Sequence, residues 1–502
     1  MQNFNLIDSP WIPVRWMAAH GSETPPMVSL NDAFTRSADI ADLDCAPHER
    51  IALTRLLVCI THAALGAPED DESWGSFGDN LAEAVSAYLK RADIYPHFNL
   101  LGEGPRFLQE NVSSKKALVP LSKMVFNLAT GNNATLLDHA GSNLSRAFNH
   151  AQVALALLTF QNFYPLFGTG FKGRGPCSDA NAIHCIIYGV NLLQTLCLNL
   201  LDHESIRDFS SADTGRPIWE CADKTTLEES TKTYLGRLVP RHRSLKLRDQ
   251  LDGFYHQNVN LEYSKWEPSR EPSTSVILNK KGERKLLSAR LKRAIWRDLH
   301  VLTAIHSKDS VGAPPVLRSH TQELNEGSAK VWAGALITDL KAKIHDTIES
   351  SFTVPRELFN DDGRRIYAAG IEYAETISQK LDFSVKVYWM EITDPDPKKP
   401  APAKSTALAS FWHQLDQSHG VLIQLASKPE ERIGKPAIGT ECAEDAWTKL
   451  VRTSARNAFD AVCPRSTPRQ IQAYANGIKP LLRAPYPKSK ETKSTSKKAS
   501  QS

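Results

Sequence analysis

Four glycines and two cations stand close together in the segment 166–176. Its sequence, Leu-Phe-Gly-Thr-Gly-Phe-Lys-Gly-Arg-Gly-Pro, contains no acidic residue. Glycine has no Cβ to block a close approach and can adopt positive φ, so the backbone of such a loop can come near another molecule. Its free N–H groups, with Lys172 and Arg174 beside them, suit a phosphate group or the edge of a nucleic-acid groove. The segment therefore predicts a contact with a polyanion, with an ordinary surface turn as the alternative.

The same glycines also match the dinucleotide-binding pattern G-x-G-x-x-G. That pattern requires a strand before it, a helix that opens from it and an acidic residue about twenty positions further on. Here a helix is predicted before the glycines, a Pro-Cys-Ser turn follows them, and residues 186–201 contain no acid. We therefore exclude a dinucleotide site.

The residue patterns that mark common enzymes are missing from the sequence. Asp138 and His139 are adjacent and Ser142 is nearby, but no G-x-S-x-G nucleophile elbow occurs. There is no Walker A, H-E-x-x-H or EF-hand pattern, and none of the eight cysteines forms C-x-x-C. We expect a protein that is not an enzyme and has no cofactor and no metal. The alternative is a nucleic-acid-processing enzyme with a dispersed site, in which changing Asp138 or His139 removes turnover but not binding.

The net charge of +4 on 502 residues is unevenly distributed. Residues 31–90 hold four Lys and Arg against eleven Asp and Glu, whereas residues 221–300 hold seventeen against ten, a net of +7. Such a concentrated basic region suggests a local site for a polyanion, and a solvated charged face is the alternative. Scattered cysteines, the lack of a secretory signal and a polar-interrupted apolar window at 185–201 favour a reduced, cytoplasmic protein that does not enter a membrane.

The spacing of apolar residues predicts an α+β fold in three parts. These are a large mixed α/β domain over 1–354, a four-helix bundle over 355–485 and a disordered basic tail over 486–502. In the first part we expect a terminal strand at 4–15, a strand or loop at 235–243, a hairpin at 275–286 that turns at Lys281-Gly282, and helices at 49–65, 144–164, 182–201, 286–305 and 328–349. In the bundle we expect long helices at 356–391, 405–425, 441–463 and 467–483.

Two motifs are distinctive: Thr130-Gly131-Asn132-Asn133-Ala134-Thr135-Leu136 with Asp138-His139, and Gly168-Thr169-Gly170-Phe171-Lys172. Both resemble the large subunit of the type I-E CRISPR surveillance complex Cascade. The opening Leu6-Ile7-Asp8…Trp11-Ile12-Pro13-Val14, the Trp266-Glu267-Pro268 block with its Lys280-Lys281-Gly282 turn, and the C-terminal bundle are similar to that family as well.

The resemblance implies a non-catalytic subunit of an RNA-guided complex. In such a complex the guide RNA reads sequence by base pairing, while protein reads a short protospacer-adjacent motif and the shape of the duplex. The implied roles are recognition of that motif, opening of the duplex for R-loop formation and recruitment of the helicase-nuclease. The implied partners are the guide RNA with the small and backbone subunits, double-stranded target DNA and the helicase-nuclease. A purely structural scaffold is a further alternative, in which Lys280, Lys281 and Lys341 can be changed without effect on DNA binding.

The resemblance also assigns residues to these roles. The motif-reading loop consists of Leu166, Phe167, Gly168, Thr169, Gly170 and Lys172. The remaining assignments are Lys341 as the wedge that enters the duplex, Lys280 and Lys281 as phosphate contacts, and Asn132, Asn133, Ala134, Thr135 and Leu136 as the loop that meets the RNA and neighbouring subunits. The chain departs from the family at Lys341, where relatives have glutamine, and near Gln257 and Asn258, where a family lysine is missing.

Overall fold

The structure, a computed structural model, divides the chain into two compact units, Met1–Phe359 and Asn360–Ser502. The residues it describes are 4–18, 24–69, 71–128, 146–163, 175–209, 214–260, 271–305, 311–319, 327–339, 344–393, 403–440 and 442–482.

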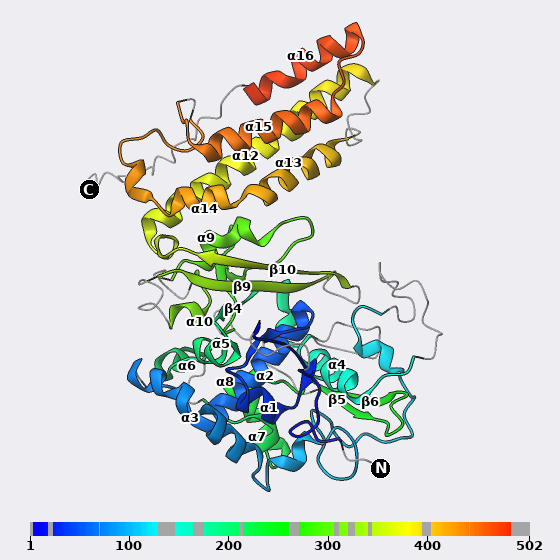
Figure 1. The fold of residues 1–502 in the computed structure, drawn as a ribbon. Coiled ribbons are helices and arrows are strands. Elements are labelled where there is room, and N and C mark those ends of the chain that lie inside the picture. The colour runs from blue at the N-terminus through cyan, green and yellow to red at the C-terminus, as the bar shows by residue number, and fades with distance from the viewer. Residues whose placement is uncertain are drawn as a thin grey trace, which may run out of the picture. The chain divides into compact units, whose positions relative to one another are not determined.

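The first unit is built around helix α2 (Pro47–Leu65), which is labelled in Figure 1. The helix begins where Pro47 presets φ and Glu49 accepts a hydrogen bond from the Ala46 N–H at 3.0 Å, and it ends at Gly66 with a φ of 83°. Its side chains are apolar on most sides, so it can be stable only inside a core. It packs against α3 (Asp71–Leu89), α4 (His150–Phe163), α8 (Tyr234–Leu238) and strand β9 (Ala329–Thr338).

Smaller elements surround this core. The antiparallel sheet β2-β1-β3 consists of β1 (Ile12–Trp16), β2 (Met27–Val28) and β3 (Ile40–Leu43). Two further sheets have two strands each: β5 (Arg243–Leu247) pairs with β6 (Phe254–Asn260), and β7 (Val276–Leu278) pairs with β8 (Arg284–Leu286). The remaining helices are α1 (Leu30–Thr35), α5 (Leu192–Leu198), α6 (His203–Phe209), α7 (Lys224–Ser230), α9 (Leu299–Leu302) and α10 (Pro315–Arg318).

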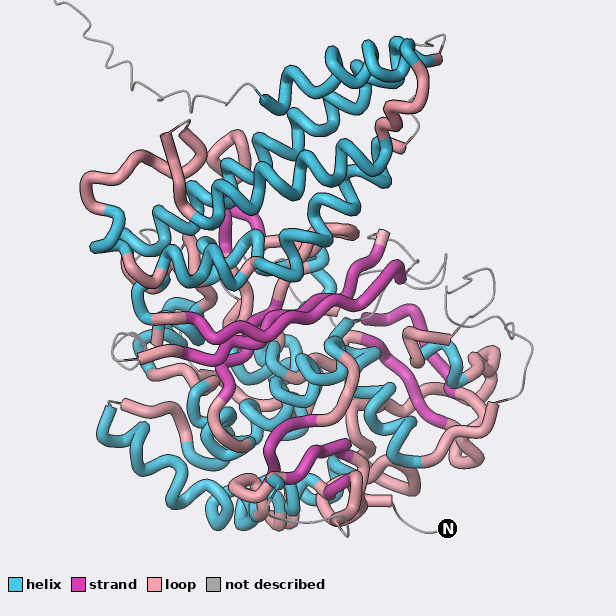
Figure 2. Tube along the Cα trace, turned by 45° about the horizontal axis from the view of Figure 1, so that its top comes forward, coloured by secondary structure: helices cyan, strands magenta, loops and turns pink. Residues whose placement is uncertain are grey.

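A second antiparallel sheet, in the order β10-β9-β4, joins distant parts of the first unit. It consists of β4 (His184–Tyr188), β9 and β10 (Ile344–Val354). The long paired strands β9 and β10 are the most extended feature of this unit in Figure 2. In register, His184 lies opposite Gly334, and Thr338 lies opposite Ile344.

The structure corrects three of the predicted helices. The strand β9 and the first part of β10 lie within 328–349, β4 and then α5 lie within 182–201, and residues 286–305 contain the end of β8 and the short helix α9. In β9 nine of the ten residues are buried, so the strand shows no two-residue alternation, and a continuous apolar run does not distinguish a strand from a buried helix. The segment 235–243, expected as a strand or loop, holds most of the short helix α8.

The second unit is a bundle of helices, as predicted. It consists of α12 (Asp361–Ile392), α13 (Lys404–Ser418), α14 (Gly420–Ala426), α15 (Ala446–Val462) and α16 (Pro468–Leu482), which are visible in Figure 1. The predicted helix 405–425 divides at His419 into α13 and α14. Tyr367, Tyr388, Phe411 and Trp447 are fully buried, and the apolar faces of the helices therefore meet in one core.

Gly370 of α12 marks a place of very close packing in this bundle. A methyl group at Gly370 overlaps Cδ1 of Leu422 and lies 3.1 Å from Nε1 of Trp447, whose N–H donates to the Gly370 carbonyl at 2.9 Å. We expect Gly370→Ala to lower the free energy of unfolding by about 1–3 kcal/mol, because overpacking displaces both side chains. Thermal unfolding checks this. The control is Gly420→Ala, where no atom lies within 4 Å, and equal melting temperatures of the two variants contradict the prediction.

All eight cysteines are free thiols, and Cys59, Cys177, Cys185 and Cys463 are buried. Among the described helices, none combines the length and the apolar character needed to cross a membrane.

Candidate nucleic-acid interface

Most of the residues assigned to nucleic-acid contact lie outside the described residues. These are Leu166, Phe167, Gly168, Thr169, Gly170 and Lys172 of the glycine loop, Lys341, and Asn132, Asn133, Ala134, Thr135 and Leu136. Asp138 and His139 also lie outside them. The structure does describe Lys280 and Lys281, and it describes the residues on both sides of the glycine loop and of Lys341.

The two ends of the glycine loop are fixed next to each other. Helix α4 ends at the buried Phe163, and the chain is described again from the buried Gly175 onward. The Cys177 thiol donates to Oδ1 of Asn162 at 3.5 Å, and both side chains are buried. The segment 164–174 therefore starts from and returns to one anchored place in the core.

Residues 181–185 follow this anchor along the chain and form backbone hydrogen bonds with distant segments. We call residues 181–185, together with these backbone partners, the β4 junction. The Ala289 N–H donates to the Asn181 carbonyl at 2.9 Å, and the Ile183 N–H donates to the Leu287 carbonyl at 3.0 Å. Two residues further along the chain, the Cys185 N–H donates to the Ser273 carbonyl at 2.7 Å. The segments just before β7 and just after β8 are thus attached to the chain that follows the glycine loop.

The β7–β8 hairpin presents the two predicted phosphate contacts at its tip. Gly282 has a φ of 80°, as a tight turn requires, and Oδ1 of Asn279 accepts from the N–H groups of Lys281 at 2.8 Å and Glu283 at 3.0 Å. Lys280 and Lys281 are both exposed, as are Arg284 and Lys285. The predicted turn at Lys281-Gly282 is confirmed, and it carries its two lysines on the surface of the first unit.

Lys341 falls in the part of the chain between β9, which ends at Thr338, and β10, which begins at Ile344. The base of this connection is fixed to the β4 junction. Nδ2 of Asn181 donates to the Thr338 carbonyl at 2.9 Å, and Oδ1 of Asn181 accepts from the Thr338 N–H at 3.1 Å and from its hydroxyl at 2.9 Å. The three elements predicted to contact DNA are therefore anchored at one place.

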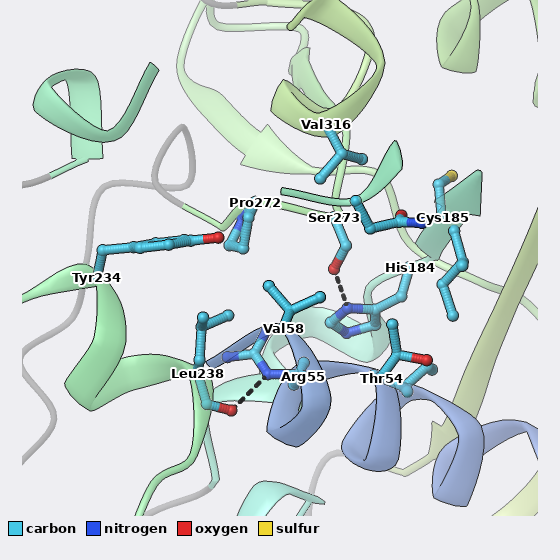
Figure 3. Close-up of a pocket in the computed structure, with 13 residues that line it drawn as sticks. Thr54, Arg55, Val58, His184, Cys185, Tyr234, Leu238, Pro272, Ser273 and Val316 are labelled. Atoms are coloured by element: carbon cyan, nitrogen blue, oxygen red, sulfur yellow. Dashed lines mark hydrogen bonds between the residues drawn. The ribbon is translucent and has the colours of Figure 1, made fainter. Parts of the chain in front are cut away.

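A buried polar cluster supports the junction from inside. Arg55 of α2 forms an ion pair with Glu271 and donates to the carbonyls of Leu238 at 3.0 Å and Arg237 at 2.7 Å. Figure 3 shows the Arg55–Leu238 bond beside His184, whose Nδ1 lies 2.8 Å from Oγ of Ser273. The cavity between these side chains has a volume of only about 30 Å³.

This cluster does not fit a metal centre, although Cys177, His184 and Glu271 offer ligand atoms within 4.8 Å of one another. Glu271 is already paired with Arg55, whose fixed positive charge opposes a divalent cation. Both ring nitrogens of His184 have partners, because Nε2 lies 3.2 Å from the Cys177 carbonyl. Burial raises the pKa of the Cys177 thiol to about 12 and so keeps it protonated. We interpret the cluster as structural support for β4.

Sequence reasoning missed Asn181, Thr338 and the Arg55–Glu271 pair. Asn181 adopts a φ of 54°, a left-handed conformation that asparagine tolerates better than most residues, but the sequence gives no local sign of this turn. Its partner Thr338 is 157 positions away.

Comparison with known proteins places the chain among the CRISPR-associated proteins. The solved structure of Thermus thermophilus CasA (Cse1) has a TM-score of 0.74 and 22% identity, and the match covers 96% of this chain and 98% of that chain. A chain of a structure described as a CRISPR RNA-guided surveillance complex has a TM-score of 0.70 and 19% identity over 95% of this chain and 99% of that chain. The CRISPR-associated protein CasA/Cse1 of Thermus thermophilus is 27% identical over 500 residues, which cover 92% of both chains.

The sequence model of the family CRISPR-associated protein Cse1 matches residues 5–458. The chain therefore belongs to the Cse1 family, as the two motifs predicted.

Proposed function

We propose that this chain is the large subunit of an RNA-guided CRISPR surveillance complex of the Cascade type. Within it the chain recognises a short motif beside the target in double-stranded DNA, helps to open the duplex and recruits the helicase-nuclease. Membership of the Cse1 family supports the assignment, as does the fold shared with a chain from a CRISPR RNA-guided surveillance complex. The observation that carries it furthest is the β4 junction, where the glycine loop, the β7–β8 hairpin and the β9–β10 connection are all anchored.

Each element has its own part in this proposal. The glycine loop, residues 166–172, presses its backbone into the minor groove, whose degenerate pattern of donors and acceptors permits several flanking motifs. Lys280 and Lys281 hold phosphates, which positions the duplex without reading its sequence. Lys341 enters the duplex and separates the first base pairs, and the loop at 132–136 meets the RNA and the neighbouring small and backbone subunits. All of these steps are binding steps, so the chain itself needs no catalytic residue.

Duplex binding by the reconstituted guide complex, with and without this chain, tests the proposal. The target carries a randomised flanking motif, and the bound and free pools are sequenced. We expect a motif preference only when the chain is present, and we expect Gly168→Asp or Lys341→Ala to abolish it. An identical preference without the chain contradicts the assignment and favours a scaffold.

The double variant Lys280→Ala/Lys281→Ala tests the phosphate contacts separately. Each lost contact lowers the slope of log affinity against log salt by about 0.9, so the double variant loses a slope of about 2. Affinity falls uniformly over all flanking motifs, because phosphate contacts carry no sequence information. Titrations of labelled duplex at several salt concentrations measure both quantities. Lys224→Ala, an exposed lysine on α7, is the control, and an unchanged slope in the double variant contradicts the prediction.

A further inference from the structure

We propose that Asn181 is a positioning residue that couples motif recognition by the glycine loop to duplex opening by the β9–β10 connection. This inference rests on the proposed function and adds to it a route by which the two events act on the same stretch of duplex. It concerns a residue that contacts neither DNA strand in the proposed arrangement.

The side chain of Asn181 is bonded to a single residue on a different part of the chain. It makes hydrogen bonds of 2.9, 3.1 and 2.9 Å to the carbonyl, the N–H and the hydroxyl of Thr338. The carboxamide thus uses a donor and its acceptor on one partner, which fixes both the distance and the orientation of the end of β9. A single hydrogen bond leaves rotation about its axis, whereas this set does not.

The backbone of Asn181 is fixed as firmly as its side chain. Ala180 and Asn181 have φ angles of 52° and 54°, so two consecutive non-glycine residues adopt the left-handed conformation. Such residues are costly and persist only where the surrounding structure holds them. The Asn181 carbonyl in turn accepts from Ala289 at 2.9 Å, on the chain that leaves the β7–β8 hairpin. Asn181, which follows the glycine loop along the chain, therefore contacts the end of β9 and the chain that leaves the β7–β8 hairpin.

The Asn181–Thr338 contact joins two positions that lie next to predicted DNA-contacting segments in the sequence. The glycine loop returns to the core shortly before Asn181, and the β9–β10 connection that contains Lys341 begins directly after Thr338. The Asn181–Thr338 bonds hold the chain that follows the glycine loop against the end of β9, from which the connection with Lys341 starts.

The variant Asn181→Gly removes the side-chain bonds and keeps the left-handed backbone, which glycine adopts without strain. The control is Ala180→Gly, which changes the adjacent left-handed residue and deletes no hydrogen bond of the set. Each variant is assembled into the complete guide complex. The probe is a duplex that carries the motif selected by the wild-type complex, with 2-aminopurine at the first base pair beside the motif, so that stopped-flow fluorescence reports opening.

We expect Asn181→Gly to slow opening of the closed duplex by about tenfold, as suits the loss of several hydrogen bonds that each contribute modestly. Binding to the same target with a pre-opened bubble, and the motif preference at equilibrium, stay at the wild-type values. If Asn181 had only a structural role, Asn181→Gly would weaken the interaction with closed and pre-opened targets equally. Ala180→Gly opens the duplex at the wild-type rate.

Two further variants test the bond itself. Thr338→Val removes the hydroxyl donor, and combined with Asn181→Gly it adds little further slowing, because both changes disrupt the same contact. Asn181→Asp retains the acceptor and loses the donor, and it restores part of the rate. The inference is wrong if Asn181→Gly opens the closed duplex at the wild-type rate. It is also wrong if the variant loses activity equally on closed and pre-opened duplexes. A wild-type complex without any motif preference overturns the proposed function instead, so the two failures are distinct.

Discussion

Acidification from about pH 7.5 to about pH 5 is expected to lower the free energy of unfolding of the first unit by about 6 kcal/mol. Three histidines of the first unit, His48, His62 and His184, are buried, and burial lowers the pKa of each from 6.5 to about 4. Below pH 6.5 these three histidines are therefore protonated in the unfolded chain, whereas in the folded chain they stay neutral until about pH 4. Their contribution to stability is complete above pH 6.5 and is lost as the pH falls.

The size of this effect follows from the width of that window. Each histidine lowers the free energy of unfolding by about 1.4 kcal/mol for every pH unit below 6.5. At pH 5 this loss is about 2 kcal/mol for each histidine and about 6 kcal/mol for the three together. Typical net stabilities are about 5–15 kcal/mol, so the loss is comparable with the whole.

The contacts of His62 show why its neutral form is required. Its Nδ1 lies 3.0 Å from the Gly66 carbonyl, while Nε2 accepts from the Leu201 N–H at 3.4 Å. A protonated ring has no acceptor nitrogen and loses the second bond. Urea unfolding at several pH values measures the dependence. His62→Gln is expected to flatten it by one proton, and a free energy of unfolding that stays constant between pH 7 and pH 5 contradicts the prediction.

Replacing Arg55 by methionine is expected to lower the free energy of unfolding by about 3–5 kcal/mol, because it leaves the Glu271 carboxylate buried without its partner. The Arg55 side chain is 5% exposed and that of Glu271 7%, so water cannot replace the lost contact. The change also removes the donors to the Leu238 and Arg237 carbonyls. The melting temperature and the denaturant midpoint report the loss.

Two companion variants make this test specific. Arg55→Met/Glu271→Leu removes both charges and is expected to recover part of the loss, since an apolar pair carries no desolvation penalty. Arg15→Ala removes a guanidinium that is 68% exposed and paired with Asp42, and it is expected to cost no more than about 1 kcal/mol. The prediction is wrong if Arg55→Met is as mild as Arg15→Ala.

Local chemistry was enough to predict much of this fold. The bundle helices have long apolar stripes that repeat with the helical period, and the structure places helices over nearly the same ranges. The Lys281-Gly282 turn was predictable because glycine at this position allows the positive φ that the hairpin needs. Mixed α and β content in the first unit followed from the same patterns.

The long-range parts of the fold had no such local signal. Nine of the ten residues of β9 are buried, so the strand shows no two-residue alternation, and a helix was predicted where a strand forms. The Asn181–Thr338 contact depends on pairing between β4 and β9, which no local window contains. The glycine loop, Lys341 and the loop at 132–136 were assigned from the family resemblance, and their roles stay predictions.

The order of the chain in the β4 junction also bears on how the protein is made. Asn181 cannot form its bonds until Thr338, 157 positions later in the chain, has been synthesised, and β4 likewise cannot pair until β9 has been made. Contacts of such long sequence separation form late, because closing the intervening chain costs entropy before any bond is gained. During synthesis the glycine loop and the β7–β8 hairpin leave the ribosome well before their common anchor can close. A prematurely terminated chain that lacks β9 therefore carries the cations and glycines of the interface without the junction that aligns them.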